Sequence, residues 1–229
     1  VYLTGHPLAR YRDLIDTFST IDHAEIRRLD DKEPVVLGGL IRQVSKMVTK
    51  TGRYAGQSMA KFILEGTTGS CPCVIFSEGY ARFSDCIKED EAVFVVGKAD
   101  LSGNSPGIRV DEVVPMGHAR EKLTSELAVA IDREMVDGPL LDELRNIFIA
   151  HPGECSVFVE VAMPGGEVVS IKTALRYGVK PCDALHAALA NVVNPSRIDY
   201  RPVHGRRREL GPAAEAEAEQ TEAMEELEA

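Results

Sequence analysis

Residues 35–49 read VVLGGLIRQVSKMVT, and this stretch decides the fold. It is long, rich in β-branched residues and interrupted by Gly38-Gly39, which is the pattern of one extended strand that bends where the glycines lie. A long, curved first strand is typical of a small closed β-barrel. We therefore expect the following residues to supply the other strands of such a barrel.

Four more β-like stretches follow at short intervals. They are Ala60–Glu65, Ser70–Phe76, Glu91–Leu101 and Ile108–Val114. Thr68-Gly69 marks a tight turn before the third strand, and residues 79–87 read as a short helix or loop before the fourth. Five strands, glycine at the bends and a helix after the third strand predict an OB-type five-stranded β-barrel.

The second half of the chain has a different rhythm. It reads as a strand at Thr124–Ile131, an amphipathic helix at Pro139–Ala150, strands at Cys155–Ala162 and Val168–Ala174, a helix at Pro181–Val193 and a strand at Arg197–Arg201. Pro164-Gly165-Gly166 predicts the hairpin turn between the two middle strands. The order β-α-β-β-α-β is the split βαβ pattern of a small ferredoxin-like domain. We therefore predict an α+β chain, with both helices on one face of the second sheet and separate cores in 35–116 and 120–203.

Composition divides the chain into four segments. They are a helical segment (6–18) and linker within 1–34, the barrel domain at 35–118, an α+β domain at 119–205 and a tail at 206–229. The tail reads Arg206-Arg207-Arg208 and then mostly Ala and Glu, and it supplies half of the net charge of -10. It has almost no large apolar side chains to bury, so we expect a disordered acidic tail. The remaining body is charged weakly enough for nucleic-acid binding.

The composition also excludes several classes of protein. There is no run of about 20 apolar residues that could cross a membrane, and the start lacks the pattern of a secretory signal. The five cysteines lack the repeated pairs of a zinc site, so we expect reduced thiols in a cytoplasmic protein. No phosphate loop, dinucleotide fingerprint or nucleophile motif is present. We predict no cofactor, no metal and no catalytic residue, and because the first residue is Val1 we expect part of a longer polypeptide.

The turn between the first two predicted strands is basic. Residues 42–61 contain five cations and no acid, and an aromatic ring lies among the cations: Arg42, Lys46, Lys50, Arg53, Lys61 and the ring of Tyr54. OB folds place phosphate contacts and a stacking ring in this loop, because cations follow a nucleic-acid backbone while an aromatic face stacks on any base. We interpret these six residues as a site for single-stranded nucleic acid, with a solvated charged hairpin as the alternative. Phe62, Phe76 and Phe94 could also stack, but phenylalanines in short strands more often form a barrel core.

Several motifs resemble the alpha subunit of bacterial DNA polymerase III. They are residues 2–8 (YLTGHPL) with Tyr11, residues 36–41 (VLGGLI) with 49–52 (TKTG), residues 58–65 (SMAKFILE), residues 69–76 with Tyr80, and residues 140–161 with His151-Pro152-Gly153. The resemblance covers roughly residues 1–202 and keeps the order of the motifs. The chain departs from the family pattern at Lys61, Gly66 and Pro72.

The resemblance implies the C-terminal end of the catalytic subunit of a replicative, DNA-directed DNA polymerase. It implies that the barrel binds single-stranded template DNA and that the second domain binds the clamp-loader tau subunit, among other replisome proteins. The metal-binding carboxylates of the polymerase would lie upstream, so this part would catalyse nothing. The residues alone leave two other hypotheses: a free-standing OB-fold protein that binds tRNA or single-stranded DNA, and an independent enzyme with a carboxylate or cysteine nucleophile, for which no nucleophile–base pair is visible.

Overall fold

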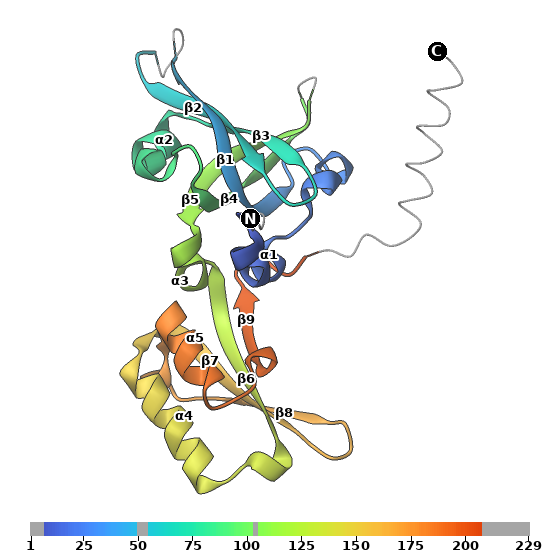
Figure 1. The fold of residues 1–229 in the computed structure, drawn as a ribbon, viewed down its shortest axis with the longest axis vertical. Coiled ribbons are helices and arrows are strands. Elements are labelled where there is room, and N and C mark those ends of the chain that lie inside the picture. Colours follow the sequence, from blue (N-terminus) through green and yellow to red (C-terminus); the bar gives the residue numbers. More distant parts are fainter. Residues whose placement is uncertain (1–6, 50–54, 103–104, 208–229) are drawn as a thin grey trace, which may run out of the picture.

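The computed structural model describes residues 7–49, 55–102 and 105–207. A barrel and a four-stranded sheet with two helices follow each other along the chain, and the short helices α1 (Arg12–Phe18) and α3 (Ala119–Leu123) lie between them (Figure 1). The predicted acidic tail lies outside the described residues from position 208 onward. Within the described ranges, no helix is long and apolar enough to cross a membrane.

Five strands form the closed barrel. They are β1 (Pro34–Val48), β2 (Ser58–Glu65), β3 (Ser70–Ile75), β4 (Ala92–Asp100) and β5 (Gly107–Pro115). Their order around the barrel is β1-β2-β3-β5-β4, and β5 then β4 close it back onto β1. β3 and β5 pair in parallel, and the other pairs are antiparallel. The helix expected after the third strand is α2 (Ser77–Phe83) with η3 (Ser84–Cys86), so the predicted OB-type barrel is confirmed.

Strand β1 pairs with two neighbouring strands along its length. Its first half pairs with β4 and its second half with β2, and Leu40 is paired with both. A Cβ atom on Gly38 would lie 2.8 Å from Cε1 of Phe94, and one on Gly39 would lie 2.8 Å from the carbonyl oxygen of Glu65. Glycine is therefore needed at both positions, because atoms of β4 and β2 come very close to β1 where its pairing changes from β4 to β2.

A bulge follows these glycines. The register between β1 and β2 shifts between Arg42 and Ser45, and Gln43 there has a φ of 54°. Glu89, from the loop before β4, accepts hydrogen bonds from the backbone N–H groups of Gln43 at 2.7 Å and Val44 at 3.1 Å. The bonds from Val44 and Gln43 lower the pKa of Glu89, because they favour its charged form. The carboxylate thus holds the bulge in shape.

Four strands and two helices form the second part. They are β6 (Thr124–Asp132), α4 (Gly138–Ala150), β7 (Pro152–Ala162), β8 (Val168–Lys172), α5 (Asp183–Ala190) and β9 (Ile198–Pro202). The predicted order β-α-β-β-α-β is confirmed. The side chain of Asp137 caps α4 by accepting a hydrogen bond from the N–H of Leu140 at 2.8 Å, and Pro139 occupies the first turn. Local sequence signals therefore set the start of this helix.

The strand order of this sheet differs from the split arrangement. The sheet runs β8-β7-β6-β9, and β6 pairs directly and in parallel with β7 from Glu126 opposite Ser156 to Asp132 opposite Ala162. A split βαβ unit would place another strand between these two, so this detail of the ferredoxin-like prediction is wrong. Element order fits both arrangements; here β8 extends the outer edge of β7, and β9 takes the other edge of β6.

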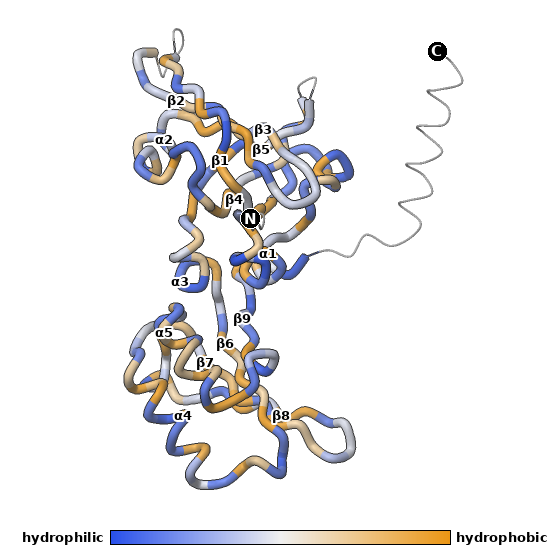
Figure 2. Tube along the Cα trace, in the orientation of Figure 1, coloured by the Kyte–Doolittle hydropathy of each residue, from blue (hydrophilic) through white to orange (hydrophobic). Residues whose placement is uncertain are grey.

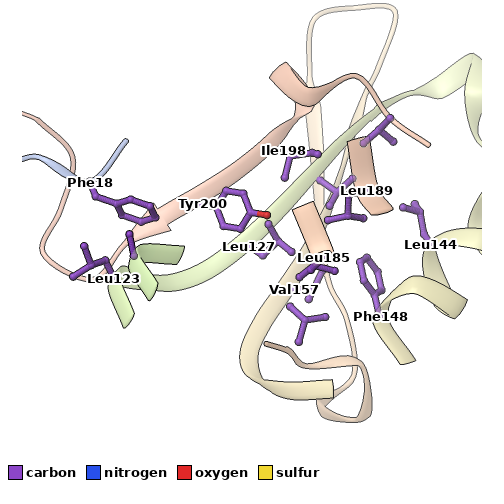
Figure 3. Packing of buried hydrophobic residues seen from close by; sticks show 14 of the residues in the cluster. Phe18, Leu123, Leu127, Leu144, Phe148, Val157, Leu185, Leu189, Ile198 and Tyr200 are labelled. Atoms are coloured by element: carbon purple, nitrogen blue, oxygen red, sulfur yellow. The ribbon is translucent and has the colours of Figure 1, made fainter. Parts of the chain in front are cut away.

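Both helices cover the same face of the second sheet, as predicted. Leu127 of β6 lies opposite Val157 of β7, so their side chains point to one face. They belong to one buried cluster with Leu144 of α4 and Leu185 of α5 (Figure 3). Hydrophobic residues likewise concentrate along the strands of both parts, and hydrophilic residues in the turns (Figure 2).

The cluster of the second sheet continues to the barrel. Phe18 of α1 is buried, and its ring meets the ring of Phe94 of β4 edge to face, with centroids 6.0 Å apart. Leu123 of α3 and Tyr200 of β9 belong to the same cluster as Phe18 (Figure 3). The barrel interior is a second cluster that contains Phe62. The expected separation into two cores therefore holds for the barrel interior only, because α1 joins the two parts.

Short 3-10 helices complete the described chain. They are η1 (Ala9–Tyr11), η2 (His23–Arg28), η4 (Met116–His118), η5 (Arg133–Met135), η6 (Leu175–Tyr177) and η7 (Pro195–Arg197). The helix predicted over residues 6–18 is formed by η1 and α1, and position 6 lies outside the described residues. The linker predicted after it contains η2, whose start has a capping box between Asp22 and Glu25.

Candidate nucleic-acid interface

The basic hairpin between β1 and β2 is described in part. Lys50, Arg53 and Tyr54 lie outside the described residues, so their assignment stays a prediction. Of the other three predicted residues, Arg42 is half-buried, whereas Lys46 and Lys61 are exposed. The structure therefore tests how three of the six side chains are arranged.

Arg42 is already engaged by two carboxylates. Its Nε lies 3.0 Å from Oε2 of Glu65, and its guanidinium also contacts Asp90. These ion pairs join β1 to the end of β2 and to the loop before β4. A guanidinium that is paired with two carboxylates is less available to a phosphate. Arg42 therefore contributes more to the stability of the barrel than to binding of a nucleic acid.

Lys46 and Lys61 lie on opposite faces of the hairpin. In the antiparallel register Lys46 is opposite Ala60, whereas Lys61 is opposite Ser45. Paired residues point to the same side, and successive residues along a strand point to opposite sides. Ala60 is buried in the barrel interior, so Lys61 is on the outer wall and Lys46 is on the inward side, where the hairpin extends beyond the core. Among the described residues, Lys46 and Lys61 therefore do not share one surface.

Lys61 instead belongs to a row of side chains that crosses four strands of the outer wall. Lys61 of β2 pairs with Val74 of β3, Val74 pairs with Arg109 of β5, and Arg109 pairs with Lys98 of β4. Each has buried neighbours before and after it in its strand, so all four point outward. We call this set the outer row.

The three cations of the outer row form no close ion pair. Within the described ranges, no carboxylate lies within 4.0 Å of the charged nitrogens of Lys61, Lys98 or Arg109. Hydrogen bonds from Ser102 and, to a lesser extent, the charge of Arg109 lower the pKa of the Asp100 carboxyl, so Asp100 is an acidic influence on Arg109. Like charges directly opposite each other in a sheet destabilise it, and Lys98 lies opposite Arg109, so this pair favours an anionic ligand. The sequence analysis missed both residues, because they are eleven positions apart in the chain and only the β4–β5 pairing brings them together.

The three phenylalanines considered for stacking are found in different environments. Phe62 and Phe94 are buried, as expected for core residues. Phe76, which follows β3, is 51% exposed, so the expectation that it belongs to the core is wrong. It lines a surface hollow of about 280 Å³ together with Lys98 and Arg109. An exposed ring beside two unpaired cations has the residue types of a base-stacking and phosphate-binding site.

The cysteines and histidines form no comparable site in the described part of the chain. All five cysteines are free, and Cys71 and Cys73 are buried in the barrel. Burial raises the pKa of the Cys73 thiol well above its ordinary value, so it stays protonated and unreactive. Among the described residues, no group of three or more His, Cys, Asp or Glu side chains is arranged to hold a metal ion.

The closed five-stranded barrel, with three cations in one row on its outer wall, has the architecture of a class of nucleic-acid-binding modules. Residues 35–116 match the OB-fold nucleic acid binding domain family. This match covers the whole barrel from β1 to β5.

The chain as a whole is similar to a particular replication protein, the DNA polymerase III subunit alpha. It is 28% identical to that of Thermus aquaticus over 190 residues, 27% identical to that of Pseudomonas aeruginosa over 195 residues and 22% identical to that of Vibrio cholerae over 202 residues. These alignments cover 82% to 87% of this chain, which spans 15% to 17% of the length of those relatives. The predicted resemblance to the DNA polymerase III alpha subunit is confirmed.

Proposed function

We propose that this chain is the non-catalytic C-terminal part of a DNA polymerase III alpha subunit and that its barrel binds single-stranded template DNA during replication. The observation that carries the proposal is the outer row, in which Lys61, Arg109 and Lys98 point outward from the strands of an OB barrel without a close ion pair in the described part of the chain. Cations spaced across a groove can follow a phosphate backbone without reading its sequence, as template binding requires.

A free-standing OB-fold protein that binds tRNA or single-stranded DNA is the alternative. The two functions share the binding surface but differ in the ligand and in the polypeptide. Similarity that extends beyond the barrel into residues 119–205 favours the polymerase, since a lone OB module needs no such domain. Competition between a tRNA and an oligodeoxynucleotide for the chain separates them: preference for tRNA would support the alternative.

Single-stranded DNA affinity should depend on the hairpin in two distinguishable ways. Changing Lys46, Lys50 and Arg53 together to Ala removes up to three phosphate contacts, so the slope of log K against log salt should fall by about 2, at about 0.7 per contact. Tyr54→Ala should weaken binding by about 1–3 kcal/mol and leave the slope almost unchanged, because stacking releases no counterions. Fluorescence anisotropy with a labelled oligothymidylate at two salt concentrations measures both. An unchanged affinity and slope in the triple variant would show that the hairpin does not bind DNA and is only a solvated charged loop.

We also propose that the second domain binds the clamp-loader tau subunit. Support comes from exposed apolar side chains on β8 and η6, among them Ile171 at 52% and Leu175 at 90% exposure. Large apolar side chains gathered on a surface are typical of a protein-binding site. The choice of tau as the partner rests on what the resemblance to the alpha subunit implies.

Charge introduced at this apolar surface should disrupt tau binding. Ile171→Glu combined with Leu175→Glu should weaken the complex at least about tenfold, because a buried unpaired carboxylate at an interface costs more than about 1.4 kcal/mol. Val203→Glu is the matched control, since Val203 is 54% exposed but lies after β9. Surface plasmon resonance with purified tau measures both variants. Equal affinities of the parent chain and the double variant for tau would show that the tau-binding site lies elsewhere.

A further inference from the structure

We propose that the hollow beside Phe76 is a nucleotide-binding site, in which one base of a single strand stacks on the Phe76 ring while Lys98 and Arg109 hold adjacent phosphates. This inference rests on the proposed function, and it adds a site outside the β1–β2 hairpin. The hollow has a volume of about 280 Å³ and lies at the end of β3, beside β4 and β5. The strand would therefore continue along the outer row past the point where β3 meets β5.

The acidic side chains of the hollow are occupied by the protein itself. Oδ1 of Asp100 accepts hydrogen bonds from the hydroxyl of Ser102 at 2.5 Å and from its backbone N–H at 3.2 Å. Asp31 accepts a hydrogen bond from the N–H of Leu101 at 3.2 Å and pairs with Lys32 at 3.6 Å. Both carboxylates thus order the start of the β4–β5 loop.

The cations of the hollow have no such partners. Within the described ranges, neither Lys98 nor Arg109 has a carboxylate within ion-pair distance, although they lie directly opposite each other. Lys32, the third cation of the hollow, is balanced by Asp31. Hydrogen bonds from Ser102 and, to a lesser extent, the charge of Arg109 lower the pKa of the Asp100 carboxyl, but Asp100 forms no ion pair with Arg109. Two neighbouring positive charges without a close ion pair are suited to a chain of phosphates, which carries repeated negative charge.

The Phe76 side chain is 51% exposed at the junction between β3 and α2. Residues on either side of it, Ile75 and Ser77, are buried, and the ring follows an alternation that points it outward. The side chain makes no cap for α2, whose first turn follows it. An exposed aromatic face beside cations stacks on a nucleobase irrespective of its identity.

Two variants of the whole chain test the site against matched controls. Lys98→Gln with Arg109→Gln should lower the salt slope for an oligothymidylate of about 16 nucleotides by about 1.4, at about 0.7 per contact. The control Lys122→Gln with Arg133→Gln removes the same charge from exposed cations of the second part and should leave the slope unchanged. Phe76→Leu should weaken binding about 5- to 150-fold without changing the slope, and Phe76→Tyr, which keeps a ring, should restore it. Circular dichroism and thermal melting check that each variant is folded.

The outcomes separate this inference from the proposed function. If the parent chain binds and both the Lys98–Arg109 variant and Phe76→Leu bind as the parent does, the hollow is not a nucleotide site. The outer row then does not carry the binding, and the proposed function is left with the hairpin residues as its site. If the parent chain binds no oligothymidylate at about 50 mM salt, both proposals fail. If the cation variant loses binding to a polyglutamate peptide as strongly as to DNA while Phe76→Leu binds DNA normally, the surface is a site for an acidic protein segment.

Discussion

Replacing Phe18 by alanine should lower the free energy of unfolding by about 3–5 kcal/mol, the usual cost of removing a buried aromatic ring. Phe18 is 1% exposed, and its ring packs edge to face on Phe94. The loss combines the transfer of the ring to water, the cavity left behind and the aromatic pair itself. Urea denaturation followed by circular dichroism measures it.

The same substitution should also uncouple the two parts of the chain. Phe18 joins the barrel residue Phe94 to Leu123 and Tyr200, so a cavity there weakens the contact between the parts more than either interior. We expect the variant to unfold in two transitions. Phe62→Ala is the control, because Phe62 is equally buried but belongs to the barrel interior, and it should cost a similar free energy. A single transition in the Phe18 variant, at unchanged stability, would contradict the bridging role of α1.

Replacing Gly97 by alanine should cost about 3 kcal/mol, the upper part of the range for overpacking. A Cβ atom at position 97 would lie 2.2 Å from the carbonyl oxygen of Arg109, and a backbone atom cannot move aside without separating β4 from β5. The substitution should also weaken binding of single-stranded DNA, because it displaces the adjacent Lys98. Thermal unfolding and oligothymidylate anisotropy measure the two effects.

Gly117→Ala is the matched control for this substitution. Gly117 has no heavy atom within 4 Å of the position of an added Cβ and no positive φ. Its replacement should change stability by less than about 0.5 kcal/mol. Similar stability losses in the two alanine variants would show that the close approach of β4 and β5 is not the cause.

The barrel could be predicted from the sequence because its signals are local. Runs of β-branched and apolar residues bounded by turn residues mark the strands, and the Gly38-Gly39 pair marks the changeover of β1 between two partners. Helix α4 was equally clear from its amphipathic pattern and from Pro139 in its first turn. The adjacency of β6 and β7 in the sheet could not be predicted in this way, since strand order depends on packing between elements that are distant in sequence.

The candidate site was predicted only in part for the same physical reason. The hairpin cations lie close together in sequence, whereas the outer row depends on the register of three strand pairs. Lys98 and Arg109 looked like ordinary solvated charges until β4 and β5 were paired. Arg42 is the converse case: it lies inside a basic segment of the sequence but forms ion pairs with Glu65 and Asp90, which are distant in sequence.

Helix α1 has a mechanical consequence for the whole chain. Phe18 packs edge to face on Phe94 of the barrel and belongs to the same buried cluster as Tyr200 of the second sheet. Helix α1 contacts both β1 and β9. We therefore expect a movement of the segment before α1 to change the orientation of the barrel and of the second sheet together.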